Sequence, residues 1–364
     1  MRLMFVVTRA DAIGGAQIHV RDVASALLAR GDEVRVVTGR RGPYTEALRR
    51  AGVPAVECPM LQRAIDPRRD LPAVAALRRE IAEFRPDVVS THSSKAGILG
   101  RFACAAGGPP CLFTAHGWAF AEGVPERQRS AYRLIERALA PLAARIVCVS
   151  EHDRQLGIAA GIAPDRMVTI HNGMPDVSPD LRAAPGKDGP VRVVMTARFD
   201  RQKDHATLLR AAAPVAGLHL DLVGDGPGLP AIRDLADDLG LGDRVRFLGH
   251  RDDVAAVLAD AHAFALVSHW EGFPRSTLEA MRAGLPAVVT DAGGSAEAIA
   301  EGETGFVVPR EDAARLEDRL RRLTADSVLR ERMGAAARRR YEAHFTFGHM
   351  LDRTTEVYRS VARR

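Results

Sequence analysis

A chain of 364 residues is longer than a single hydrophobic core usually supports, so we expect two domains. Its hydrophobic content of 46% is ordinary, so both domains can be globular. The net charge of +5 and the pI near 9.3 leave an anionic partner open, either a nucleic acid or a membrane surface. The four cysteines show neither a C-x-x-C pair nor a metal-ligand spacing, so we expect small buried thiols in a reducing cytosol.

No segment is predicted to cross a membrane or to direct export. Residues 1–7 lead directly into a strand pattern that is soon followed by the charged residues Arg9 and Asp11, which is not the pattern of a signal peptide. The longest stretch without a formal charge, 102–121, contains the turn sequence Gly107-Gly-Pro-Pro. We therefore expect a cytoplasmic protein, peripheral at most on the cytoplasmic face of a membrane.

Positive charge is concentrated between Arg35 and Arg85, where eleven arginines accompany six acidic residues. Two interpretations remain open: solvated helix faces, or contact with anionic lipid, to which each arginine near the surface would contribute about 1 kcal/mol. Aromatic residues are not interleaved with these arginines and no nucleic-acid-binding motif appears, so no nucleic-acid partner is expected.

The first half of the chain alternates apolar runs with amphipathic segments. We expect strands at residues 3–7, 34–38, 87–91, 111–114, 144–149 and 168–170, and helices at 16–30, 44–51, 71–83, 130–142 and directly after 150. Ser150 and Asp153 have the spacing of a helix cap. Gly14 and Gly15 open the first helix without a full G-x-G-x-x-G, which permits close backbone approach but is a weak dinucleotide signal.

Residues 174–190 are rich in Pro, Asp, Gly and Ala and lack clear periodicity, so they are predicted to be a linker. The alternation then restarts. We expect strands at 191–196, 218–223, 246–248, 263–267, 287–290 and 305–308, and helices at 206–213, 274–283, 313–323, 327–341 and 350–363. Strands that alternate with helices predict a parallel sheet in each half.

Polar residues follow two strands of the first half. His92 and Lys95 come after the strand at 87–91, and His116 and Trp118 come after the next strand. The carboxyl edge of a parallel sheet is where open α/β folds bind ligands. Other interpretations stay open: a solvated loop for Lys95, a structural histidine, and core packing for Trp118.

In the second half, Arg198 and Lys203 follow the strand at 191–196 and precede a helix. Arginine can grip two phosphate oxygens and lysine can act as a point charge, so the pair suits a diphosphate, although R-x4-K alone is unspecific.

The stretch from Ser268 to Gly284 contains the densest set of candidate residues. Glu271 and Glu279 frame a short helix that Pro274 opens and Gly284 closes, and free amide groups at such a helix start suit a phosphate. A structural alternative exists, because a capping box from Ser276 would occupy Glu279 and leave Glu271 an ordinary surface acid.

Four features in chain order, namely Gly14-Gly15, His116-Gly117, Arg198…Lys203 and Glu271…Glu279, resemble the retaining glycosyltransferases of family 4, and the run from Phe113 to Phe120 resembles enzymes of bacterial envelope and capsular polysaccharides. The resemblance spans essentially the whole chain. It implies the GT-B fold, an α/β architecture of two Rossmann-like doubly wound domains facing each other across a cleft. It also implies an acceptor-side domain at 1–173, a linker at 174–190, a donor-binding domain at 191–344, and a C-terminal helix at 345–364 that crosses back to the first domain.

The resemblance also implies roles for individual residues. In the family the first glutamate lies at the transferred sugar and the second binds the ribose diol. The resemblance implies catalytic roles for His116, Arg198, Lys203 and Glu271. Donor binding falls on Gly15, Arg198, Lys203, Gly249, His250, Glu271, Gly272, Phe273, Pro274, Ser276, Thr277, Leu278 and Glu279. Acceptor-side candidates are Gly14, His92, Lys95 and Trp118.

The implied reaction transfers a sugar from a nucleotide-sugar, with a UDP-sugar favoured, to an acceptor hydroxyl with retention of configuration. A lipid-linked glycan is the preferred acceptor. No D-x-D sequence occurs, so no metal and no cofactor are expected, and protein cations would stabilise the departing diphosphate. Two alternatives remain: a nucleotide-sugar epimerase of the same fold, and a basic nucleic-acid-binding protein.

Overall fold

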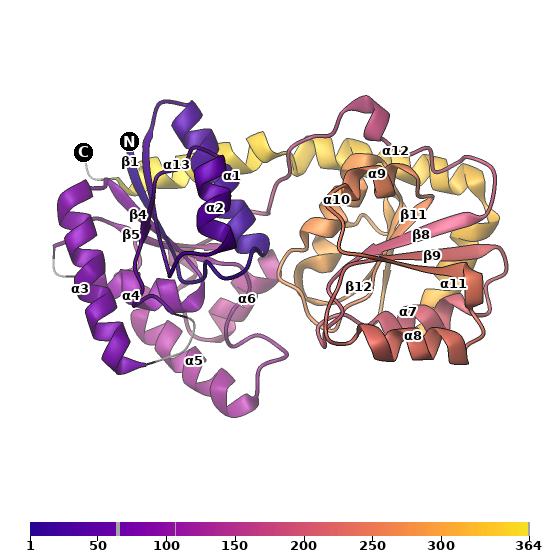
Figure 1. Ribbon diagram of the computed structural model, residues 1–364, viewed down its shortest axis with the longest axis horizontal. Helices are drawn as coiled ribbons and strands as arrows, with labels where there is room; N and C mark the ends of the chain where they lie inside the picture. Colours follow the sequence, from indigo (N-terminus) through magenta and orange to yellow (C-terminus); the bar gives the residue numbers. More distant parts are fainter. Residues whose placement is uncertain (63–65, 106, 363–364) are drawn as a thin grey trace. The chain divides into compact units, whose positions relative to one another are not determined.

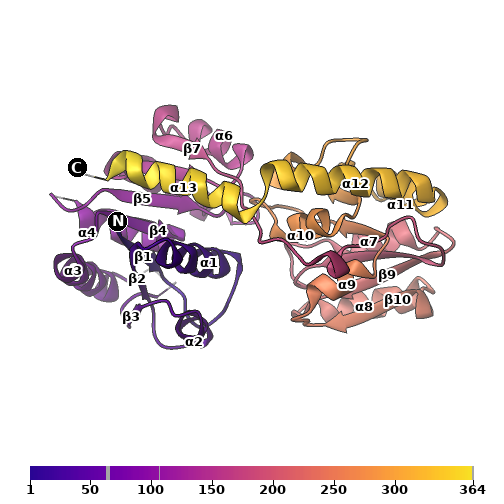
Figure 2. The same ribbon diagram turned by 90° about the horizontal axis from the view of Figure 1, so that it is seen from above.

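The computed structural model describes residues 1–62, 66–105 and 107–362. The chain forms two compact units: the first comprises Met1–Ile170 and the residues from Leu351 onward, and the second comprises His171–Met350. Each unit has one parallel sheet with helices on both faces (Figures 1 and 2). Among the described residues, no helix is both long and apolar enough to cross a membrane.

The sheet of the first unit has seven strands in the order β3-β2-β1-β4-β5-β6-β7. The strands are β1 (Arg2–Val7), β2 (Glu33–Thr38), β3 (Ala55–Glu57), β4 (Val88–His92), β5 (Cys111–Ala115), β6 (Arg145–Cys148) and β7 (Met167–Thr169). Its helices are α1 (Gly15–Ala29), α2 (Pro43–Arg50), α3 (Pro67–Phe84), α4 (Ser94–Cys104), α5 (Glu126–Leu139) and α6 (Glu151–Ala159). The strand order reverses direction between β1 and β4, and ligands bind at such points in open α/β sheets.

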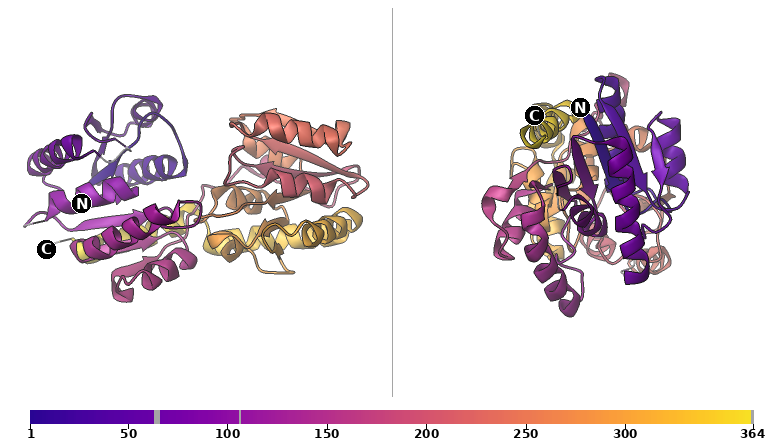
Figure 3. Two further views of the ribbon diagram at one scale, coloured as in Figure 1. Left: turned by 90° about the horizontal axis from the view of Figure 1, so that it is seen from below. Right: turned by 90° about the vertical axis from the view of Figure 1, so that its left-hand side faces the viewer.

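Alternate residues of β1 pack on opposite faces of the first sheet. Met4 and Val6 join a buried cluster with residues of α3 and α4. On the other face the ring of Phe5 meets the edge of Tyr358, which belongs to the C-terminal helix α13 (Phe347–Val361). The right-hand view of Figure 3 shows helices on both sides of the first sheet. The period-2 alternation along one strand thus forms two apolar layers.

The sheet of the second unit has six strands in the order β10-β9-β8-β11-β12-β13, with its own reversal between β8 and β11. The strands are β8 (Val191–Thr196), β9 (Leu218–Val223), β10 (Val245–Gly249), β11 (Ala263–Leu266), β12 (Ala287–Thr290) and β13 (Gly305–Val308). The helices are α7 (His205–Ala212), α8 (Leu229–Asp238), α9 (Val254–Ala259), α10 (Arg275–Ala283), α11 (Ala313–Ala325) and α12 (Ser327–His344). In Figure 1, α9, α10 and α12 cover one face of this sheet and α7, α8 and α11 the other.

The predicted doubly wound α/β fold is confirmed, and every predicted strand is present. The sequence pattern missed β3 and the helices α4, α8 and α9. Helix α4 was not predicted because Gly97 and Gly100 lower its helix propensity. Both glycines are needed for close packing, since a Cβ on them would approach the Phe113 ring to 2.6 Å and the Thr91 methyl group to 2.4 Å.

Helices α3 and α5 both begin before their predicted starts. Helix α3 begins at Pro67, four residues before the expected start, because the carboxylate of Asp66 accepts from the amide of Arg68 and caps the first turn. The predicted end of the C-terminal helix at 363 lies outside the described residues. Ser150 caps α6 as expected, by accepting from the amide of Asp153.

Candidate functional site

In the second unit, the loop that follows β8 is joined to the loop that follows β11. Lys203 and Ser268 form an antiparallel bridge. The amide of His269 donates to the carbonyl of Gln202 at 2.9 Å, and the amide of Asp204 donates to the carbonyl of Val267 at 2.9 Å. These backbone bonds bring the predicted diphosphate residue Lys203 and the predicted sugar residue Glu271 to the same sheet edge.

The carboxylate of Glu271 is fully engaged by side chains. Its Oε1 forms an ion pair with the Lys203 ammonium and accepts from the Ser268 hydroxyl at 2.6 Å, while its Oε2 accepts from Gln202 Nε2 at 3.1 Å. The Glu271 and Lys203 side chains are only 7% and 13% exposed. The ordinary-surface-acid alternative for Glu271 is therefore wrong.

Glu279 has the opposite environment. It is half-buried, and the structure gives its carboxylate no hydrogen bond or ion pair with any described residue. Burial raises its pKa above the ordinary value, against the opposing charges of Arg282 and Arg275. Helix α10 begins only at Arg275 and has Pro274 at its N-cap, so Glu279 lies in the second turn and the capping-box alternative is wrong.

The first turn of α10 carries the other predicted donor contacts. Pro274 supplies no capping side chain, so the first amides of the helix lack that partner. Phe273 and Leu278 are buried and fix the loop to the core, while Gly272 and Ser276 are half-buried. The hydroxyl of Thr277 is buried without a hydrogen-bond partner among the described residues. The turn thus offers several polar groups to a ligand.

Three further predicted donor residues end strands at the same edge. Arg198 follows β8, is 70% exposed, and lies 3.8 Å from Asp200, so its guanidinium remains accessible. Gly249 ends β10, and its carbonyl accepts from the amide of Gly224 at 2.8 Å. His250, next to it, is exposed, and its one ion-pair contact within the part of the chain that the structure describes is with Asp252 at 3.5 Å.

In the first unit, a cavity of about 410 Å³ lies at the ends of β1, β4 and β5. Its lining includes Thr8, Arg9, Ser93, His116 and Gly117. Ser93 has φ = 115°, which is strained for a residue with a side chain, and its hydroxyl contacts the Thr8 hydroxyl at 3.1 Å. Strain of this kind clusters at ligand sites.

Lys95 also lines this cavity, but its charge is already matched. Its ammonium lies 2.6 Å from the Asp70 carboxylate of α3, and the side chain is 8% exposed. The solvated-loop alternative for Lys95 is wrong, because the residue lies in the first turn of α4.

Three histidines gather beside the cavity. His92 Nδ1 lies 3.0 Å from His116 Nε2, and the ring of His19 packs 5.5 Å from His92 and 5.0 Å from His116 between centroids. One nitrogen from each ring lies within 4.8 Å of the others, so this group could hold a metal ion. Burial, together with the neighbouring His116 and His19, places the pKa of His92 well below its ordinary value.

The remaining first-unit candidates divide by exposure. Gly14 caps α1 and Gly15 begins it, and both are exposed. Trp118 is buried, stacks on Phe120 with centroids 4.8 Å apart, and donates its indole N–H to the Asp153 carbonyl. The structure therefore gives Trp118 the core-packing role.

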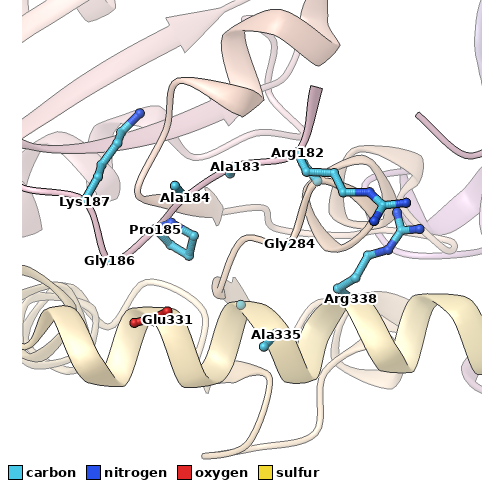
Figure 4. Close-up of a pocket in the computed structure, with 12 residues that line it drawn as sticks. Arg182, Ala183, Ala184, Pro185, Gly186, Lys187, Gly284, Glu331, Ala335 and Arg338 are labelled. Atoms are coloured by element: carbon cyan, nitrogen blue, oxygen red, sulfur yellow. The ribbon is translucent and has the colours of Figure 1, made fainter. Parts of the chain in front are cut away.

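A second cavity, of about 570 Å³, lies elsewhere in the second unit and contains none of the predicted site residues. Figure 4 shows it between the segment from Arg182 to Lys187 and helix α12. The Arg338 guanidinium on its wall is bound by both carboxylate oxygens of Asp176 at 2.6 Å.

Comparison with known families decides the identity of the chain. Residues 13–176 match the model described as "Glycosyltransferase Family 4", and residues 177–340 match the model described as "Glycosyl transferases group 1". The chain is a family 4 glycosyltransferase. It is therefore an enzyme of the sugar-transferring class, as predicted.

The sequences of individual relatives align with this glycosyltransferase over most of their length. It is 27% identical to an Escherichia coli UDP-Gal:alpha-D-GlcNAc-diphosphoundecaprenol alpha-1,3-galactosyltransferase, over 90% of this chain and 88% of the relative. It is 26% identical to the E. coli O-antigen biosynthesis glycosyltransferase WbnH, over 85% of this chain and 86% of the relative. Among solved structures, Anabaena HepE in complex with UDP shares the fold, with a TM-score of 0.86, 23% identity, and coverage of 99% and 100%.

Sequence reasoning missed several residues that complete these sites. Gln202 and Ser268 both bind Glu271, and their only sequence signal is proximity to Lys203 and to Glu271 itself. His19 lies on α1 one turn after Gly15, so the orientation of that helix toward the sheet edge was the available signal.

Proposed function

We propose that this glycosyltransferase transfers a sugar from a UDP-sugar to a hydroxyl of a lipid-linked glycan, with retention at the anomeric carbon, during assembly of a cell-envelope polysaccharide. The Glu279 carboxylate carries the proposal for the donor. It is half-buried and lacks a described partner, and it follows a helix start without a capping side chain. A ribose diol supplies hydroxyl donors for the carboxylate and a diphosphate suits the amides, so one nucleoside diphosphate would satisfy both.

The relatives support a uridine donor and a lipid-linked acceptor. HepE was solved with UDP, and the E. coli galactosyltransferase is named for UDP-Gal and for a diphosphoundecaprenol acceptor. WbnH is named for O-antigen biosynthesis. These names favour an envelope polysaccharide as the product. Such an acceptor would place the enzyme at the cytoplasmic face of the membrane.

The proposed reaction balances without an added reactant. The bond between the anomeric carbon and the β-phosphate oxygen breaks, and a bond from that carbon to the acceptor oxygen forms. The acceptor's proton passes to the leaving phosphate, which departs as UDP. Arg198, Lys203 and the first turn of α10 would stabilise the charge that develops on this leaving group, while Glu271 would bind the transferred sugar.

Calorimetry with UDP, GDP and ADP tests the donor site. We expect UDP to bind most tightly, and Glu279→Gln to weaken its affinity by about tenfold or more, because a hydrogen bond to a charged group contributes about 1.5–3 kcal/mol. Glu303→Gln, an exposed change in the same unit, is the matched control. Equal affinity of wild type and Glu279→Gln for UDP would contradict the assignment. Release of free sugar without any acceptor would favour the epimerase.

Vesicle sedimentation tests the membrane part of the proposal. Several arginines of the basic stretch are already paired, including Arg35 with Glu80 and Glu83, and Arg49 with Glu46. Arg63 lies outside the described residues. We expect binding to anionic vesicles at low salt that weakens as salt is added. Absence of binding at low salt would favour a soluble acceptor.

A further inference from the structure

A chain of buried hydrogen bonds connects the C-terminal helix to His116. The hydroxyl of Tyr358 on α13 donates to Ser90 Oγ at 3.1 Å. Ser90 Oγ lies 3.0 Å from His92 Nε2, and His92 Nδ1 lies 3.0 Å from His116 Nε2. Tyr358, Ser90 and His92 are each at most 2% exposed, so water does not compete for these bonds.

The Tyr358 hydroxyl has no other hydrogen-bond partner among the described residues, so its hydrogen is satisfied only if it donates to Ser90 Oγ, and this direction sets the others. Because the Tyr358 hydroxyl donates to Ser90, the Ser90 hydroxyl keeps its own hydrogen for His92 Nε2. A neutral imidazole has one donor and one acceptor nitrogen, so His92 then carries its hydrogen on Nδ1 and donates it to His116 Nε2. Accepting at Nε2 leaves a neutral His116 with its hydrogen on Nδ1.

We propose that Tyr358, Ser90 and His92 are positioning residues that fix His116 in the Nδ1–H tautomer. His116 lines the 410 Å³ cavity of the first unit. In this tautomer its Nε2 is occupied as an acceptor, so His116 does not act as a general base, and any bond that it makes to a substrate through Nδ1 is one in which it donates. This role agrees with a reaction in which the leaving phosphate accepts the proton, and in that respect it rests on the proposed function.

The environment keeps His92 neutral, as the chain of bonds requires. Desolvation is the main cause of its low pKa, and the adjacent His116 and His19 act in the same direction. The Phe5 ring, 5.7 Å away between centroids, adds an apolar neighbour. A protonated His92 would have no acceptor nitrogen for Ser90.

Metal binding by the three histidines is the competing arrangement. A metal ion bound at His92 Nδ1 would need the lone pair of that nitrogen, which places the hydrogen on Nε2. Ser90 would then accept from His92, and His92 could not donate to His116. The two arrangements exclude each other at a single proton position.

Nitrogen-15 NMR of the full-length protein with labelled histidine measures that proton position directly. In the wild type we expect a protonated Nδ1 and an unprotonated Nε2 at His116. Ser90→Ala should give a mixture of tautomers at His116 and lower kcat about tenfold with little change in KM, as loss of an orienting hydrogen bond typically does. Tyr358→Phe should shift the same signals to a smaller extent.

Tyr341→Phe is the matched control, because Tyr341 is another buried tyrosine whose hydroxyl donates to a backbone carbonyl, that of Met174 at 2.9 Å. It should lower stability without changing the His116 signals or kcat. A protonated His116 Nε2 in the wild type, or unchanged tautomers in Ser90→Ala, would overturn the proposal. So would one equivalent of Zn²⁺ bound and lost in His92→Ala.

The two readouts separate this inference from the proposed function. If the tautomer signals respond as expected but no sugar is transferred from any UDP-sugar, the positioning residues stand and the transferase assignment fails. If sugar transfer is observed but the His116 tautomer is the same in Ser90→Ala as in the wild type, the positioning inference is wrong and the proposed function is unaffected.

Discussion

The two units of this glycosyltransferase place polar groups at the same topological position but give them opposite electrostatic character. In the second unit, Lys203 and Glu271 follow β8 and β11, and both are charged and paired. In the first unit, His92 ends β4 and His116 follows β5, and burial keeps His92 neutral. The same sheet edge thus presents a charged Lys203–Glu271 pair in one unit. In the other it presents a histidine group around a neutral His92, next to Arg9 and the Lys95–Asp70 pair.

This difference matches the chemistry proposed for each unit. A diphosphate leaving group gains negative charge in the transition state, so cations and helix amides that are already in place stabilise it. A sugar or acceptor hydroxyl carries no net charge, so oriented neutral groups suffice. The doubly wound fold supplies the position, while the loop residues determine the charge.

The largest expected effect comes from Lys203→Ala. It removes the cation from the predicted diphosphate site and leaves the Glu271 carboxylate, 7% exposed, without its ion-pair partner. We expect kcat to fall on the order of 100-fold and the free energy of unfolding to fall by about 3 kcal/mol, as when one partner of a buried pair is lost. Sugar transfer and urea unfolding measure the two effects.

Lys187→Ala is the control for that variant, because the one hydrogen bond of the Lys187 ammonium with a described residue is to the Asp260 carbonyl at 2.9 Å, and Lys187 lies outside the predicted site. It should leave both quantities nearly unchanged. If Lys203→Ala retained full activity, the charged character assigned to the second unit would have no functional meaning.

The next effect concerns the loop after β12, which packs against Glu271. A Cβ on Gly293 would lie 2.0 Å from the Glu271 carbonyl oxygen, and the residue has φ = 59°. We expect Gly293→Ala to lower the free energy of unfolding by about 3 kcal/mol, from backbone strain together with the clash, and to raise KM for the donor by displacing Glu271. Urea unfolding and steady-state kinetics measure this.

Gly302→Ala separates the clash from the strain. Gly302 has φ = 75°, in the same left-handed region, but nothing lies within 4 Å of the position of its Cβ. It should show only the cost of strain, about 1 kcal/mol, and an unchanged KM. Equal behaviour of the two variants would mean that the loop does not position Glu271.

The strands and the charged site were predictable from sequence for identifiable reasons. Fully buried strands such as 263–266 are continuous apolar runs. Arg198, Lys203 and Glu271 follow strands within a few residues, and Glu279 lies on the helix after the Glu271 loop, so local order alone placed them at one edge. The paired state of Glu271 was not predictable, because Gln202 reaches it from another loop, 69 positions away.

The histidine group was harder to predict. His92 and His116 were expected at the edge, but their contact depends on the register between β4 and β5, which pairs His92 with Thr114. His19 comes from a helix and Tyr358 from the far end of the chain, 268 positions from Ser90. Such long-range contacts leave no periodic signal in the sequence.

The smallest expected effect is a difference in pH dependence between two carboxyl groups, one in each unit. Burial raises the folded-state pKa of Glu279 above its unfolded value of about 4.3. The wild type therefore loses stability as pH rises from about 4 through the raised pKa, and Glu279→Gln should lack this loss. Relative to the wild type, the variant should become more stable as pH rises through that window.

Glu46 on α2 should show the opposite sign. Its hydrogen bond to Arg49 lowers its pKa to about 2, so its contribution is present above the unfolded pKa and is lost as pH falls through the folded value. Relative to the wild type, Glu46→Gln should therefore become less stable as pH rises from about 3 to 5. Urea unfolding of the three proteins across pH 3 to 7 measures both differences. If the free energy of unfolding changed with pH in the same way for the two variants, the Glu279 carboxylate would have a charged partner in solution. There would then be no reason to expect a ribose at that carboxylate.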